Sequence, residues 1–263
     1  DCPAFGRYVA DIAEHFVGEG VPVRYVSPVN EPQWKWTGGQ EGCHYRPWGV
    51  RWALRATAEE LEKRPALKTV KLSGPENGDI RFFNKIYIRW MLRDKVIRRN
   101  IDAVDVHSYF TILKVPLIAK QLNDRRAFLR RFGRWMAKKH PDLPIKMSEW
   151  CHMKGGRDKG MDSALEMAKI MVEDFSLMNA VSWQHWIAVS EVDFCDGLIY
   201  INLDDKSFEL TKRYYATGNF SLFIKPGAQR VAAEADNDNL LLLAFDNAGE
   251  TVMIAVNPTD EEL

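Results

Sequence analysis

Two kinds of hydrophobic pattern alternate along the first 190 residues of the chain. Segments with apolar residues three or four positions apart, such as Phe5, Val9 and Ile12, predict amphipathic helices. Short runs of apolar and β-branched residues between these segments predict strands. The helices are expected at about 4–18, 47–63, 81–98, 117–139 and 162–178, and the strands at about 23–29, 69–73, 101–108, 144–149 and 180–187. This alternation favours an α/β fold in which right-handed helical crossovers join parallel strands.

The pattern changes after residue 190. Residues 198–201 predict a short strand, and residues 206–224 contain one further helix. From Pro226 onward the chain has the pattern of antiparallel strands, because two apolar runs at 240–245 and 251–256 are joined by a polar, Gly-containing turn. A β-hairpin is therefore expected near the end of the sequence.

Charge and cysteine content narrow the class of protein. Lys and Arg total 36, and Asp and Glu also total 36, so the formal net charge is zero and no nucleic-acid partner is expected. No apolar run approaches the ~18–20 residues that a membrane span requires. The four cysteines form no CxxC pair, so we expect no zinc site or other metal, and the sequence leaves open whether they form disulfides. They are Cys2, Cys43, Cys151 and Cys195.

Two glutamates stand at strand ends in contexts that favour chemistry. Asn30-Glu31-Pro32 follows the predicted strand 23–29, and Glu149 ends the strand 144–149 just before Trp150. Because Pro32 biases the preceding residue away from helix, Glu31 is expected to project from the carboxyl end of its strand, where parallel sheets place their ligands. Taken alone, either glutamate would more simply be a solvated or salt-bridged loop residue.

The spacing of the two glutamates supports a joint role. They are 118 residues apart, and at ~40 residues for each βα unit this separation places their strands opposite each other in an eight-strand barrel. Retaining glycosidases use two carboxylates ~5–5.5 Å apart, one protonated and one ionised. Strand-end glutamates beside aromatic residues therefore suggest a carboxylate pair that acts on a sugar.

These motifs resemble the clan of retaining (β/α)8 glycoside hydrolases, and within it glycoside hydrolase family 30. The stretch 214–231, Tyr-Tyr-Ala-Thr-Gly-Asn-Phe-Ser-Leu-Phe-Ile-Lys-Pro-Gly-Ala-Gln-Arg-Val, is similar to the segment that leads from the family's barrel into a C-terminal β-sandwich. Residues 27–36, Ser-Pro-Val-Asn-Glu-Pro-Gln-Trp-Lys-Trp, are most similar to the endo-β-1,6-galactanase branch. The resemblance implies that Glu31 is the general acid/base, Glu149 the nucleophile and Asn30 the amide that binds the sugar 2-hydroxyl.

The resemblance also implies further substrate contacts. His107 and Tyr109 alternate along one strand and so share a face, where such residues contact or orient the nucleophile; a satisfied core histidine is an equal alternative for His107. Trp186 is expected to be a sugar platform and Trp183 a packing residue. The remaining expected substrate contacts are Trp34, Trp36 and Trp150. Glu76 could be a third acidic contact, although a solvated turn is the simpler interpretation. No cofactor is expected.

Five predicted strands match the fourth to eighth of the family barrel, so the strands that would match the first three are missing. We therefore expect an N-terminally truncated, incomplete (β/α)8 barrel over 1–225, followed by the beginning of a β-sandwich over 226–263, and inactive by itself. The predicted protein is a monomeric, secreted or periplasmic retaining hydrolase of β-linked glycans, with β-1,6-galactan as the leading substrate. Xylan, glucosylceramide-type β-glucosides and a non-catalytic carbohydrate-binding role are the alternatives; a metal hydrolase is disfavoured because no HExxH motif occurs.

Overall fold

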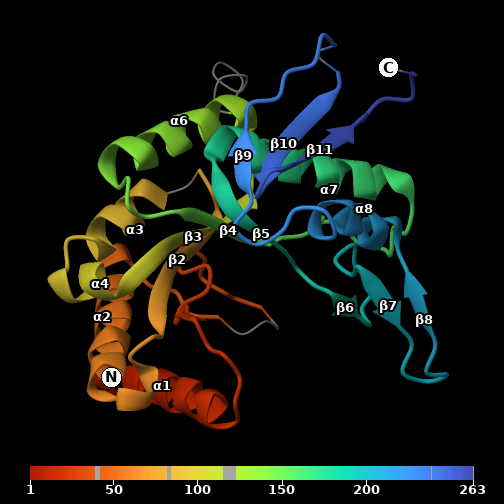
Figure 1. The fold of residues 1–263 in the computed structure, drawn as a ribbon. Coiled ribbons are helices and arrows are strands. Elements are labelled where there is room, and N and C mark those ends of the chain that lie inside the picture. The colour runs from red at the N-terminus through yellow and green to blue at the C-terminus, as the bar shows by residue number, and fades with distance from the viewer. Residues whose placement is uncertain (39–41, 82–83, 115–122, 238, 263) are drawn as a thin grey trace. The chain divides into compact units, whose positions relative to one another are not determined.

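The computed structural model describes residues 1–38, 42–81, 84–114, 123–237 and 239–262, which form two compact units, Asp1–Glu149 and Trp150–Leu263 (Figure 1). The first unit contains α1 (Cys2–Gly18), β1 (Tyr25–Val26), α2 (Pro47–Lys63), a 3-10 helix (Pro65–Leu67), β2 (Lys71–Asp79), α3 (Asn84–Met91), α4 (Lys95–Asn100), β3 (Ile101–Tyr109), α6 (Arg125–Lys139) and β4 (Ile145–Trp150, whose last residue belongs to the second unit). Strands and helices alternate here as the sequence predicts.

The strands of the first unit run parallel in the order of the chain. Tyr25 pairs with Lys71, Ser73 with Ala103, and Val104 with Ile145. Nearly every residue of β2 and β3 is buried, as expected for parallel strands that are covered on both faces. Helices α2, α3 and α6 lie along one side of these strands (Figure 1). The carboxyl ends of the strands thus come together at one edge, where the candidate site lies.

Three predicted elements differ from the structure. The first strand covers only Tyr25–Val26 instead of 23–29, because Pro28 has no N–H to continue the ladder. The second strand does not end at residue 73 but continues to Asp79, through the residues predicted to turn. The single helix expected at 81–98 is two helices, because Asp94 accepts a hydrogen bond from Val96 N and starts α4 as its N-cap.

The helix expected at 117–139 is observed as α6, and its expected start lies outside the described residues, which omit 115–122. Asp124 caps it by accepting a hydrogen bond from Ala127 N at 2.8 Å. Helices α1 and α2 pack closely, because Gly6 has no side chain: a Cβ there would lie 2.6 Å from the carbonyl of Ala56.

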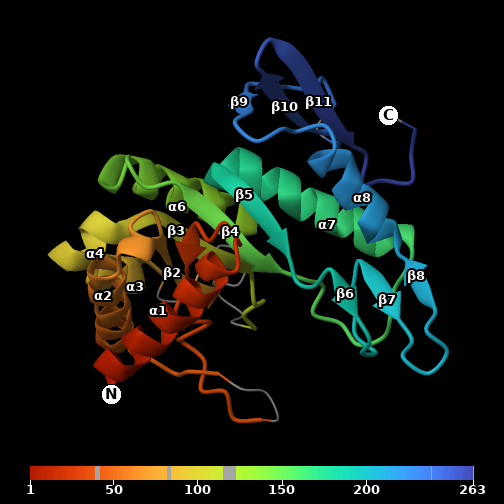
Figure 2. The ribbon, with the colours of Figure 1, turned by 60° about the horizontal axis from the view of Figure 1, so that its bottom comes forward.

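The second unit contains α7 (Met161–Glu173), a π-helix (Asp174–Met178), β5 (Ala180–His185), β6 (Val189–Ser190), β7 (Ile199–Ile201), β8 (Phe208–Leu210), α8 (Lys212–Ser221), β9 (Gln229–Val231), β10 (Leu241–Asn247) and β11 (Glu250–Val256) (Figure 2). Trp186 N, just after β5, donates to Trp150 O at 2.9 Å. The hairpin predicted from the last apolar runs is confirmed, since β10 and β11 pair antiparallel from Leu241 with Val256 to Asn247 with Glu250.

A buried arginine organises the second unit. Arg213 of α8 is fully buried and donates to Asp158 O at 2.5 Å, Ser163 Oγ at 2.6 Å and Gly197 O at 2.7 Å. The nitrogen Nη2, which donates to Gly197 O, also donates to Tyr200 OH at 3.1 Å. One side chain thus ties α7, α8 and the loop before β7 together.

The architecture is that of a partial (β/α)8 barrel, which confirms the predicted fold class. The boundary expected near residue 225 and the sandwich expected after it stay predictions. Cys2, Cys43, Cys151 and Cys195 are free thiols. Among the described residues, no helix has both the length and the apolar character needed to cross a membrane.

Candidate active site

Glu31 lies in the loop after β1, and its backbone is held in place from two sides. Its N–H donates to Glu76 O at 2.8 Å, and its own carbonyl accepts from Trp34 N at 3.1 Å and Trp36 Nε1 at 3.2 Å. Its φ of 41° lies in the left-handed region, which a residue with a Cβ adopts only at a cost. The surrounding structure therefore fixes the direction of this buried carboxylate.

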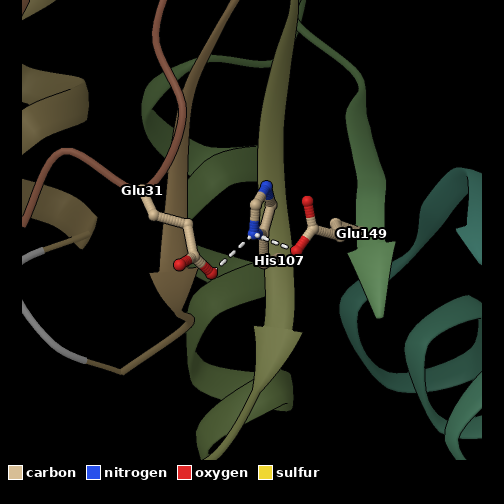
Figure 3. A group of neighbouring side chains, drawn as sticks. All are labelled: Glu31, His107 and Glu149. Atoms are coloured by element: carbon tan, nitrogen blue, oxygen red, sulfur yellow. Dashed lines mark hydrogen bonds and ion pairs between the residues drawn. The ribbon is translucent and has the colours of Figure 1, made fainter. Parts of the chain in front are cut away.

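His107 of β3 lies between the carboxylates of Glu31 and Glu149, as Figure 3 shows. Its Nδ1 is 3.0 Å from Glu31 Oε1 and 3.5 Å from Glu149 Oε1, and its Nε2 is 3.3 Å from Glu76 Oε2. Strand register explains part of this arrangement, because His107 pairs directly with Glu149 on β4. The imidazole is 1% exposed, so three carboxylates surround a ring that water barely reaches.

This arrangement controls the charge on His107. Burial by itself would lower the pKa of His107, but hydrogen bonds to Glu31 and Glu76 and the nearby charge of Glu149 raise that pKa to about 9. At neutral pH the ring is therefore an imidazolium, with a proton on each nitrogen. Burial likewise opposes ionisation of Glu76, but the hydrogen bond and charge of His107 and the Ser148 hydroxyl hold the pKa of Glu76 below its usual range.

Glu149 is in a different electrostatic environment. Burial raises the pKa of Glu149, and the charge of Glu31 adds to that effect, while the charge of His107 and a hydrogen bond from Tyr109 act in the opposite direction. Tyr109 OH donates to Glu149 Oε1 at 3.2 Å. His107 and Tyr109 thus share the face that their spacing in the sequence predicts, and each contacts Glu149.

One carboxylate oxygen of Glu31, one of Glu149 and one ring nitrogen of His107 all lie within 4.8 Å of one another. Such a cluster of donor atoms could also hold a metal ion. Both nitrogens of His107 face carboxylates and carry protons in its charged form, so this ring has no lone pair to offer while it is an imidazolium. The expectation of no metal stays a prediction.

Glu76 is a site residue that the sequence interpretation considered as a third acidic contact but placed second to a solvated turn. The expected solvated turn is wrong: Glu76 is 7% exposed, lies within β2 and has a φ of 58°. Gly74-Pro75 just before it has the composition of a turn, yet here the strand passes through it with an irregular register opposite β3. One feature of the sequence could have indicated the buried position of Glu76: the residues after Leu72 are small or polar, which fits the interior of a barrel as well as a turn.

A second buried polar group lies next to Glu76. Burial raises the pKa of Asp105 to about 7, with a contribution from the charge of Glu76. Lys146 of β4 is buried nearby and its Nζ lies 3.0 Å from the centre of the Tyr25 ring. Strands β2, β3 and β4 thus carry several ionisable side chains close to one another, among them Glu76, Asp105 and Lys146 in addition to His107 and Glu149.

Other predicted contacts in the first unit are more open. Asn30 is exposed, and Trp34 is 39% exposed. Gly78 on β2 makes room for both Glu31 and Trp34, because a Cβ at this position would lie 2.6 Å from Trp34 Nε1 and from Glu31 Cδ. Trp36 is half-buried and is oriented by its hydrogen bond to the Glu31 carbonyl. The substrate contacts of Asn30, Trp34 and Trp36 stay predictions.

The remaining predicted aromatic residues belong to the second unit. Trp186 is 47% exposed, whereas Trp150 is 6% exposed and its ring lies 6.0 Å from that of Trp183. Trp183 Nε1 donates to Asp174 Oδ2 at 3.0 Å, a packing role like the one expected. The exposed face of Trp186 is available to a ligand, and the contacts described for Trp150 are packing contacts.

Comparison with known proteins now adds to this geometry. Residues 1–200 match the family model of O-glycosyl hydrolase family 30. The chain belongs to this family. The family predicted from the sequence motifs is therefore confirmed.

Solved structures show the same fold. A conserved exported protein from Bacteroides fragilis is similar over 99% of this chain and 60% of its own, with 22% identity and a TM-score of 0.80. The catalytic domain of GH30 xylanase C from Talaromyces cellulolyticus matches 97% of this chain and 54% of its own, with 13% identity and a TM-score of 0.72. An endo-β1,6-glucanase matches 97% of this chain and 56% of its own, with 17% identity and a TM-score of 0.70. The chain thus spans little more than half the length of these proteins.

Proposed function

We propose that this family 30 protein hydrolyses β-linked glycans with retention of configuration, using Glu31 and Glu149. The observation that carries the proposal is the distance between the two carboxylates, whose oxygens lie within 4.8 Å of each other around His107. Retaining enzymes have carboxyl groups ~5–5.5 Å apart, whereas inverting enzymes need ~6.5–9.5 Å to admit a water molecule. The short separation supports a double displacement.

In the proposed reaction Glu31 donates a proton to the glycosidic oxygen while Glu149 attacks the anomeric carbon. The bond to the leaving sugar breaks, and a covalent glycosyl–Glu149 ester forms. Glu31, now ionised, removes a proton from water, which attacks the same carbon and releases Glu149. Tyr109 supports the nucleophile, because its hydroxyl donates to the oxygen Oε1 of Glu149 and stabilises the ionised form.

The leading substrate is β-1,6-galactan. Residues 27–36 resemble the endo-β-1,6-galactanase branch, and one structure with the same fold is an endo-β1,6-glucanase. Xylan is the main alternative, because another structure with this fold is a xylanase. A glucosylceramide-type β-glucoside is the third candidate. Release of reducing sugar from these substrates by the full-length protein would rank them.

The catalytic proposal is tested by trapping the ester. A mechanism-based 2-fluoro-sugar should label the peptide that contains Glu149, as seen by mass spectrometry. Glu149→Ala should abolish turnover of an activated aryl glycoside, and added azide should restore it with inverted product. Glu31→Gln should slow substrates with poor leaving groups far more than activated ones. Labelling at another residue, or turnover by Glu149→Ala without azide, would contradict the assignment.

We further propose that the protein acts outside the cytoplasm. Its two leading candidate substrates, β-1,6-galactan and xylan, are polymers too large to enter cells intact, and one protein of the same fold is described as exported. Cell fractionation of the source organism with an antibody against this chain tests the proposal. Detection in the cytoplasmic fraction alone would overturn it.

A further inference from the structure

In two regions of the first unit, nearly all charged side chains are positive. Residues 84–100 and 125–139 together contain thirteen Lys and Arg residues and a single acidic residue, Asp94. They form the helices α3, α4 and α6, in a chain whose total formal charge is zero. Figure 1 shows α3, α4 and α6 on the same side of the strands β2 and β3. The charge of this part of the surface is therefore strongly unbalanced.

The cations of α6 are arranged along one face of the helix. Arg126, Arg130, Arg134 and Lys138 are all exposed and follow one another at intervals of four residues. Such residues lie one above the other, ~6 Å apart along the axis. Like charges at this spacing destabilise a helix, and arginines in the first turn are unfavourable beside the positive end of the helix dipole. Helix stability therefore does not explain this sequence.

Helix α3 adds cations to the side of this row. Lys85 Nζ and the Arg89 guanidinium lie 5.4 and 5.5 Å from the centre of the Trp135 ring, on α6. Burial lowers the pKa of Lys85, and the charges of Arg89 and Arg131 lower it further, which reflects how closely these cations gather.

The three cations of the row that follow Arg126 are not neutralised by a carboxylate of the described residues. In the described part of the chain, no carboxylate lies within 4.0 Å of Arg130, Arg134 or Lys138. The nearest acids in sequence are engaged elsewhere: Asp94 pairs with Arg51 and caps α4, and Asp124 caps α6. The balancing charge must therefore come from ions or from a partner.

We propose that this cationic surface, formed by Arg126, Arg130, Arg134 and Lys138 of α6 with Lys85 and Arg89 of α3, binds an acidic polysaccharide. A straight row of cations on a convex helix suits a linear polymer with regularly spaced anions. Guanidinium groups bind carboxylate and sulfate through two parallel hydrogen bonds. The proposal goes beyond the catalytic one, because it concerns side chains of α3 and α6 that take no part in the reaction proposed above.

Two other polyanions fit less well. A helix that binds a membrane surface inserts a broad apolar face, but the apolar face of α6, formed by Leu129, Phe132 and Met136, is buried in the fold. The exposed Ile86 of α3 is one apolar residue beside the cations and not such a face. A nucleic acid offers phosphates that these cations also attract, but the role outside the cytoplasm proposed above places the protein among polysaccharides, and the proposal rests on that role here.

The test is binding of the full-length protein to polygalacturonate and dextran sulfate, measured by affinity electrophoresis at two salt concentrations. Wild-type protein should bind both polymers at low salt, and its affinity for them should fall as the salt concentration rises. The double variant Arg130→Glu/Arg134→Glu should bind at least about tenfold more weakly. Its helix should remain folded, because the changes relieve repulsion with Arg126 and Lys138; circular dichroism checks this.

Controls separate this proposal from its alternatives. A matched double variant of exposed lysines elsewhere, Lys68→Glu/Lys225→Glu, should bind like wild type. Glu149→Ala should also bind like wild type, so that failure of the catalytic proposal leaves this measurement intact. Equal binding by Arg130→Glu/Arg134→Glu and wild type, no binding to either polymer, or tighter binding to duplex DNA or to vesicles rich in phosphatidylserine would overturn the proposal.

Discussion

His107 turns its second ring nitrogen toward Glu76, with 3.3 Å between Nε2 and Oε2. Glu76 in turn accepts a hydrogen bond from Ser148, and its carbonyl accepts the N–H of Glu31 at 2.8 Å. One residue of β2 therefore positions both the imidazole and the backbone of the proposed acid/base.

Glu76→Gln should lower the pKa of His107 from about 9, because an amide can still accept a hydrogen bond from Nε2 but carries no charge. The measurement is an NMR titration of the imidazole in protein labelled at histidine, which needs no substrate. Ser148→Ala is the matched control: it removes a partner of Glu76 but keeps the charge, so it should shift the pKa of His107 less. An unchanged His107 titration in Glu76→Gln would contradict the positioning role.

His107 should also make stability depend on pH. Its pKa is raised from 6.5 to about 9 in the folded protein, so its stabilising effect is complete below pH ~6.5 and is lost as pH rises through about 9. At ~1.4 kcal/mol for each pKa unit, the shift corresponds to on the order of 3 kcal/mol. Urea unfolding at pH 6.5 and pH 9 should show this loss in wild type and a smaller loss in His107→Gln. A loss of the same size in both proteins would assign it to other groups.

Tyr109→Phe should move the acidic limb of the kcat/KM profile to higher pH. The variant loses the hydrogen bond from Tyr109 OH to Glu149 Oε1, which favours the ionised carboxylate, so the pKa of Glu149 should rise further. Because the proposed nucleophile must be ionised, activity should appear only at higher pH. A uniform loss of activity without a shift of the limb would indicate a packing effect instead.

Gly78→Ala should reduce activity while the fold is kept. The new Cβ would displace the Glu31 carboxylate and the indole of Trp34, which both occupy this space. A 1 Å displacement of a catalytic group can cost about 100-fold in rate. Gly218→Ala in α8, where a Cβ meets its first neighbour at 3.9 Å, is the control and should keep full activity. Wild-type activity in Gly78→Ala would show that Glu31 does not need this space.

The alternation of two hydrophobic patterns along the chain predicts the fold class, because the helices of a barrel have apolar residues three or four positions apart whereas its strands are short apolar runs. The strand-end motifs identify Glu31 and Glu149, and the family resemblance adds His107 and Tyr109; the structure brings these four residues together. The pattern fails at Gly74-Pro75-Glu76, because local turn chemistry there is overridden by pairing with β3. No local signal places Glu76 beneath His107: that contact joins residues 31 positions apart and depends on register.

Prediction from the sequence also succeeds only in part for the second unit. The final hairpin is predictable from its turn, and Gly249 has the positive φ of 99° that the turn requires. The buried position of Arg213 is not predictable, because its partners, which include the carbonyls of Asp158 and Gly197 and the side chains of Ser163 and Tyr200, come from separate segments that no local pattern links.

Arg213→Ala should destabilise the second unit by about 3–5 kcal/mol, because it leaves a cavity and several buried acceptors without a donor. Lys212→Ala, at an exposed position one residue earlier, should change stability by no more than ~0.5 kcal/mol. Chemical denaturation of both variants measures the difference. Equal stabilities would show that the Arg213 contacts contribute little.

The left-handed backbone at Glu31 has a consequence for making inactive forms of this protein. Glycine normally weakens a protein relative to alanine, yet at a φ of 41° only glycine avoids the clash of a Cβ with the backbone. Both substitutions remove the same carboxylate. The free energy of unfolding of Glu31→Gly should therefore exceed that of Glu31→Ala by ~1–2 kcal/mol, and Glu31→Gly should melt at a higher temperature. The usual ranking of the two smallest residues is therefore reversed at the position of the proposed acid/base. Glycine is then the better choice for capturing an uncleaved glycan in the site.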